Sequence, residues 1–233
     1  MVDSHLKGQC SLLIEFSSWA ASFRVSFYFV ESSRGHSHQH LFVLDTQNLQ
    51  DGNSIFHTHS LYHAGISTDD YDHEYLVHGP VRGNCLAVVP FSKLMAEGIY
   101  DLHPDLKKTP KLEYGGWSYT GPALPIAPAD VETAKKLALL FEPGFALPVA
   151  LYLLSGRIPI WSGQDEVDPK ELQIIIDGLK EFEQFPNNLS FVEGVFTKRF
   201  PEVEDALTLT RSFIKAKRGH DQRCLPVDST QDT

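Results

Sequence analysis

A Pro- and Gly-rich segment in the middle of the chain constrains its fold more than any other feature of the sequence. From Pro104 to Pro128 there are five prolines and three glycines. These residues interrupt helices and strands, because proline lacks a backbone N–H and glycine leaves the backbone unrestrained. We therefore expect an irregular connection over residues 111–128 between an α+β part (1–110) and a helical part (129–218), with a loose tail (219–233).

The part before this connection contains apolar runs of strand length separated by turn-forming residues. Leu41–Leu44, Glu74–His78 and Cys85–Val89 are such runs, and they predict a small mixed or antiparallel sheet. Between Trp19 and Val30 the large apolar residues recur every three or four positions, which predicts a helix with one apolar face.

The part after the connection has helical periodicity throughout. It predicts helices over Ala129–Phe141, Phe145–Leu154, Asp168 to about Phe185, and Pro201 to about Lys217. The third of these starts with Asp-Pro, which suits a helix N-terminus. The predicted fold class is thus α+β, a small N-terminal sheet with a helix followed by an all-helical half. The expected core residues of that half are Phe141, Phe145, Leu151, Ile175, Leu179, Leu207 and Ile214.

Charge and cysteine content narrow the class of partner and the compartment. A net charge of −10 argues against nucleic-acid binding, which needs clustered Lys and Arg. The three cysteines, Cys10, Cys85 and Cys224, are far apart and odd in number, as in a reduced compartment. We find no signal-peptide pattern and no apolar stretch long enough to span a bilayer. We therefore expect a cytoplasmic or nuclear protein that is not secreted and has no membrane partner.

Acidic residues crowd against the start of the predicted strand Glu74–His78. Asp72 and Glu74 are two positions apart, so an extended backbone would place both carboxylates on one side of the strand, about 7 Å apart. Such a pair can stabilise an oxocarbenium-like centre and orient or deprotonate a nucleophile. Alternatively, the run is only a charged, solvated strand start with an Asp capping a turn.

Histidines also concentrate in the first part of the chain. Eight of the eleven lie between His36 and His78, some of them in His-x-His pairs. Alternation along a strand would place both rings of such a pair on one face, as zinc sites require. The simpler interpretation is a set of polar residues at turns, because no HExxH motif and no cysteine partner accompany them. We assign no metal ligand.

The order of these segments carries one further signal. A Ser-bearing apolar strand at Ser11, an aromatic-rich helix, the strand Leu41–Thr46 and the acidic strand start Asp72–Glu74 follow one another. Over roughly residues 9–90 this order resembles the later part of the ADP-ribosyltransferase core, in the cholera-toxin-like branch. It looks especially like a divergent fungal domain that shares that layout.

The resemblance implies roles for three residues. In the enzymes a Ser-Thr-Ser strand shapes the nicotinamide pocket, and the second Glu of a Glu-x-Glu pair engages the nicotinamide ribose. By position, Ser11 would contact the cofactor and Asp72 and Glu74 would be the catalytic acidic pair. The chain departs from the pattern in having Asp at the first acidic position and Cys10-Ser11-Leu12 in place of Ser-Thr-Ser. Few residues precede Cys10, where the enzymes have an Arg- or His-bearing first strand that holds the dinucleotide.

Three functions follow as hypotheses. The first is a non-catalytic or degraded ADP-ribosyltransferase-like module that binds a protein partner and needs no cofactor. The second is an active ADP-ribosyltransferase or NAD glycohydrolase that uses NAD and Glu74. The third is a metal-binding protein that uses the histidine-rich segment.

Overall fold

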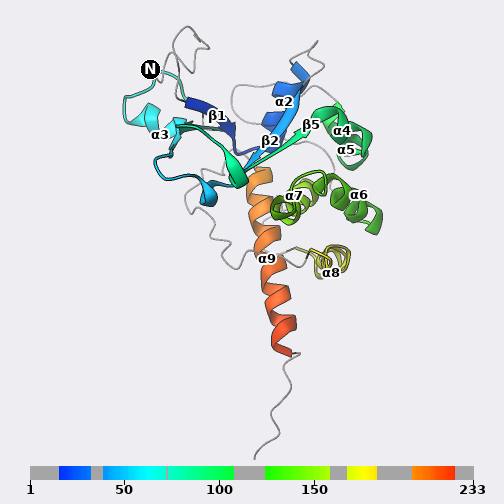
Figure 1. Ribbon diagram of the computed structural model, residues 1–233. Helices are drawn as coiled ribbons and strands as arrows, with labels where there is room; N and C mark the ends of the chain where they lie inside the picture. The colour runs from blue at the N-terminus through cyan, green and yellow to red at the C-terminus, as the bar shows by residue number, and fades with distance from the viewer. Residues whose placement is uncertain are drawn as a thin grey trace, which may run out of the picture.

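The protein has an α+β fold in which the strands lie in the first half of the chain and the later half is helical, as the sequence predicts (Figure 1). The computed structural model describes residues 16–32, 39–71, 73–107, 124–157, 167–182 and 201–223. Most of the expected connection and part of the expected tail lie outside these residues. Within the described residues, no helix is both long enough and apolar enough to cross a membrane.

The strands form two small antiparallel sheets. In the first, β1 (Phe16–Ala20), β4 (Glu74–His78) and β3 (Ser54–His57) lie in that order. In the second, β2 (His40–Leu44) pairs with β5 (Leu86–Pro90). The predicted strand Glu74–His78 is confirmed at both ends, and the other two predicted strands are confirmed to within a residue or two.

The predicted helix from Trp19 to Val30 is wrong at its start. Trp19 lies in β1, where it pairs with Tyr75 of β4, and its indole N–H donates to Ser17 Oγ at 2.8 Å. The helix α2 begins only at Phe23 and ends at Ser32. Apolar spacing could not indicate this, because the preference of Trp19 for a strand comes from a partner strand far away in the sequence.

Short helices connect the strands and follow the second sheet. They are α3 (Thr58–His63), α4 (Phe91–Ala96) and α5 (Ile99–Leu102), with single 3₁₀ turns η1 (Thr46–Asn48), η2 (Gly83–Cys85) and η3 (Pro104–Lys107). Neither β3 nor α3 was predicted from the sequence.

Within the described residues, the second half contains the helices α6 (Pro128–Ala138), α7 (Pro143–Ser155), α8 (Pro169–Gly178) and α9 (Pro201–Arg223). α7 packs against α6 and α9, and α8 packs against the same two helices. The predicted start of α8 is confirmed, since Asp168 Oδ1 accepts from Lys170 N at 2.7 Å. α9 extends past the predicted end near Lys217.

One hydrophobic core joins the two-stranded sheet and α2 to the helices of the second half. Phe27, Val89 and Phe91 belong to the same buried cluster as Leu151 and Ile175. The three-stranded sheet contributes no residue to that cluster. The two sheets therefore differ in what covers them.

Most of the expected core residues of the helical half are confirmed: Phe141, Phe145, Leu151, Ile175 and Leu179 are buried. Leu207 and Ile214 are only half-buried. In α9 the fully buried side chains are instead Leu209 and Phe213. Both pairs have helical spacing, and the choice between these neighbouring faces is made by packing against α7 and α8.

Candidate functional site

A tight turn fixes the start of the acid-bearing strand β4. Glu74 N donates to Tyr71 O at 3.0 Å, and the hydroxyl of the fully buried Thr58 is shared between the carbonyl oxygens of Tyr71 and, at 3.0 Å, Glu74. Ala21 N, just after β1, donates to His73 O at 3.2 Å. The backbone around Glu74 is therefore held from both β1 and α3.

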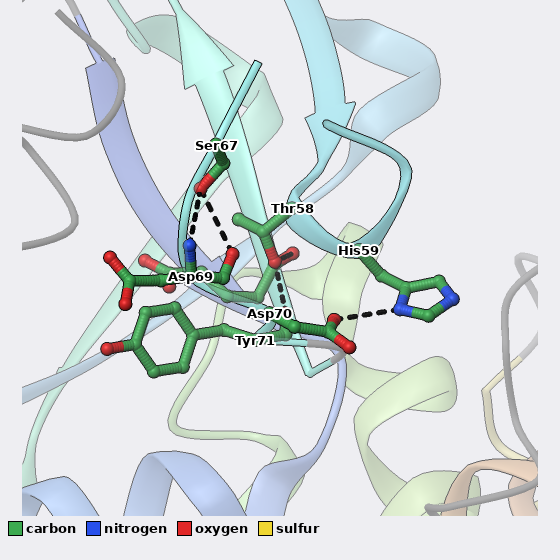
Figure 2. A network of polar contacts seen from close by, with 7 residues as sticks. Thr58, His59, Ser67, Asp69, Asp70 and Tyr71 are labelled. Carbon is green, nitrogen blue, oxygen red and sulfur yellow. Dashed lines mark hydrogen bonds and ion pairs between the residues drawn. The ribbon is translucent and has the colours of Figure 1, made fainter. Parts of the chain in front are cut away.

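The loop before this turn is attached to α3 by side chains (Figure 2). Asp70 Oδ1 lies 2.8 Å from His59 Nδ1, and this contact is partly shielded from solvent. Ser67 Oγ donates to Asp69 O at 3.0 Å and accepts from Asp69 N at 3.1 Å. The carboxylate of Asp70 thus contacts α3, whereas Asp69 takes part in the loop through its backbone N–H and C=O.

Of the three predicted site residues, the structure describes only Glu74. Glu74 is the half-buried first residue of β4. Ser11 and Asp72 lie outside the described residues, so their predicted roles stay predictions.

The pairing of β1 with β4 brings a different serine to the face that carries Glu74. Ala20 lies opposite Glu74 and Ser18 lies opposite Leu76, so Ser18 and Glu74 share one face of the sheet as diagonal neighbours. Diagonal partners of this kind have Cα atoms about 7–8 Å apart. In the sequence this serine belongs to a Ser-Ser pair at positions 17–18 between Phe16 and Trp19, and no local motif marks it as a site residue.

A large apolar hollow lies between the sheets, over the opposite face of β4. Its volume is about 650 Å³, and Tyr75 and Val77 line it from β4. The His57 ring stacks on Tyr75 with centroids 4.6 Å apart. Burial raises the pKa of Tyr75, so its phenol stays neutral. No Asp, Glu, Lys or Arg occurs among the described residues that line this hollow, and Glu74 is not one of them.

A second, more open hollow of about 960 Å³ runs along β1, and all five residues of Phe16–Ala20 line it. Two loops close one end. Asn53 Nδ2 holds them together by donating to His78 O at 3.1 Å and to Pro80 O at 3.2 Å. Among its described lining residues, Asp51 is the only Asp, Glu, Lys or Arg. The two hollows adjoin, because β1, α2 and β2 supply residues to both.

The histidines at the end of β3 and in α3 pack against one another. The ring centroids of His59 and His63 are 4.3 Å apart, and those of His57 and His59 are 5.8 Å apart. Among the described residues, however, no three His, Cys, Asp or Glu side chains are grouped so that they could hold a metal ion. His36 and His38 lie outside the described residues.

A buried polar cluster between α2 and the helical half was not predicted from the sequence. His103 is almost inaccessible, and its Nε2 lies 2.8 Å from Leu153 O. Burial, with the nearby Arg24 and Arg157, lowers the pKa of His103 to about 4. Arg24 pairs with Asp105 in the same region. This cluster links α2 to the helical half and has no cavity large enough for a ligand.

Comparison of the chain with family models, with curated proteins and with solved structures gave no match. The resemblance to ADP-ribosyltransferases therefore stays a prediction.

Proposed function

We propose that this chain is an ADP-ribosyltransferase-like module that binds a protein partner and does not turn over NAD. One observation carries the proposal: Glu74 lines neither of the two large hollows. Most enzymes that cleave a glycosidic bond use carboxyl groups beside the reacting carbon. Among the described lining residues, the apolar hollow has no carboxylate and the open hollow has one, that of Asp51.

The direct test is release of nicotinamide from NAD by the purified chain, followed by chromatography. We expect no release above the buffer control. Release by the wild-type chain that Glu74→Gln abolishes, at an unchanged melting temperature, would refute the proposal. The isosteric substitution is suitable because the backbone of Glu74, rather than its side chain, makes the contacts with Thr58 and Tyr71.

A second candidate function is an active ADP-ribosyltransferase or NAD glycohydrolase. It is favoured by the position of Ser18 and Glu74 on one face of two paired strands, since the resemblance implies a serine strand beside an acidic strand. This candidate predicts that Ser18→Ala and Glu74→Gln both abolish nicotinamide release. Ser17→Ala is the matched control, because Ser17 lies on the opposite face and bonds to Trp19.

A further inference from the structure

The outer edge of β2 presents backbone groups that β5 does not use. Asp45 N donates to Cys85 O at 2.8 Å, and in an antiparallel ladder only alternate residues bond to the partner strand. The N–H and C=O groups of Phe42 and Leu44 therefore point away from β5. Within the described part of the chain, these groups have no hydrogen-bond partner.

Both hollows lie along this same edge. Leu41–Leu44 line the apolar hollow, and His40–Phe42 line the open one. Because alternate side chains point to opposite faces of a sheet, consecutive residues can share one hollow only where it runs beside the strand edge. β5 supplies only Leu86 to the described lining, and its own outer edge includes Pro90, which has no N–H to offer.

The sheet also carries an apolar face toward solvent. Phe42 and Val88 lie opposite each other, and they are 50% and 44% exposed, respectively. Their neighbours Leu41 and Val89 point the other way and are buried. Solvent-facing positions of an antiparallel sheet are usually polar, so the exposed ring of Phe42, on the edge strand β2, is suited to packing beside the side chains of an added strand.

We propose that the edge of β2 binds an extended peptide segment of a partner protein, which adds to the sheet as a third strand. The inference rests on the proposed binding function and names the kind of partner. Backbone bonds to Phe42 and Leu44 would hold the segment, and its apolar side chains on the exposed face would pack beside the ring of Phe42.

The net charge of this chain indicates which residues alternate with the apolar residues in the bound segment. The chain has a net charge of −10, and the described lining of the hollows includes Asp51 but no Lys or Arg. We therefore infer a segment in which apolar residues alternate with Lys or Arg. An acidic segment would be repelled by the field of the whole chain.

The test uses a pool of synthetic seven-residue peptides in which Lys or Arg alternates with Val, Ile, Tyr or Phe. Binding of fluorescent members to the full chain is measured by anisotropy. In the tightest binder, N-methylation of the amides that face β2 should weaken binding about tenfold or more, whereas N-methylation of the other alternate set should change it less than about twofold. Equal effects of the two sets, or no binding by any peptide, would overturn the inference.

Variants of the protein test whether the peptide binds at the outer edge of β2. Phe42→Pro removes the outward N–H without removing a bond to β5, and it should abolish peptide binding. Val88→Pro is the matched control, because its N–H points to the far edge of β5, and it should bind within about twofold of wild type. Phe42→Ala removes the ring but keeps the backbone N–H, so comparison with Phe42→Pro separates the two effects. If Phe42→Pro is folded by circular dichroism and binds like wild type, the inference is wrong.

The experiments distinguish a failure of the proposed non-catalytic function from a failure of the strand-addition inference. If no peptide binds and no nicotinamide is released, the strand-addition inference fails and the non-catalytic function stands. If nicotinamide is released through Glu74, the proposed function fails, whatever the peptide does.

Discussion

The buried His103 should make the stability of this protein depend on pH. Its Nε2 faces the carbonyl of Leu153 at 2.8 Å, and a carbonyl only accepts, so the neutral ring holds its proton on Nε2. Burial is the main cause that lowers the pKa of His103 from 6.5 to about 4. The positive charge of Arg24 acts in the same direction, and the carboxylate of Asp105 opposes it.

The direction of this pH dependence follows from the number of protons that the folded and the unfolded chain bind at His103. The unfolded chain protonates His103 below its ordinary pKa of 6.5, whereas the folded chain keeps the ring neutral down to about 4. Acid therefore favours the unfolded state, and stability falls as the pH drops from 6.5 to 4. At about 1.4 kcal/mol for each pH unit the full loss is about 3 kcal/mol, of which about 2 kcal/mol is lost by pH 5.

Urea denaturation at pH 7, 6 and 5 measures this loss, with His103→Gln as the comparison. The Gln amide can still donate to Leu153 O but does not titrate, and every other ionisable group is common to both proteins. We expect the free energy of unfolding of the wild type to fall by about 2 kcal/mol more than that of the variant between pH 7 and pH 5. Parallel pH profiles for the two proteins would refute the reasoning.

Three further predictions concern packing and the turn before β4. Gly178→Ala should destabilise by about 1–3 kcal/mol, because the added Cβ would lie 2.4 Å from Val131 Cγ1; Gly144→Ala, with no atom within 4 Å, is its control and should be neutral or stabilising by thermal melting. Phe213→Ala should lower the free energy of unfolding in urea by about 3–5 kcal/mol, since this side chain is fully buried; a loss below 1 kcal/mol would show that α9 is not part of the core. Thr58→Val should cost about 1–3 kcal/mol in the same assay, because it removes, at a fully buried position, the hydroxyl that donates to the carbonyl oxygens of Glu74 and Tyr71, and an unchanged midpoint would contradict the assigned role of its hydroxyl.

The sequence predicted best those elements whose ends have local causes. β4 stops at a Gly-Pro turn in which Gly79 has a φ of +91°, a value that favours glycine. α8 starts where Asp168 caps a helix with Pro169 in its first turn. In both cases the residues that make the signal also make the structure.

Features that depend on a distant partner were missed. β1 exists because β4 pairs with it some sixty residues later, and Trp19 has no local reason to leave a helical pattern. The burial of His103 likewise depends on Leu153, in a helix that follows the Pro- and Gly-rich segment. Periodicity reports which residues could share a face, but not which face another element will cover.

The position of Glu74 shows why an acidic motif alone did not determine a function. Glu74 and Tyr75 are adjacent in β4, so their side chains lie on opposite faces of the sheet. The Glu74 face carries Ser18, as an enzyme related to the transferases would require, and the Tyr75 face lines the hollow that reaches the edge of β2. Because Glu74 lines neither of the hollows beside β2, Glu74→Gln probes catalysis without altering the peptide edge, and Phe42→Pro probes that edge without altering Glu74. One strand therefore allows the enzymatic and the binding hypotheses to be tested independently.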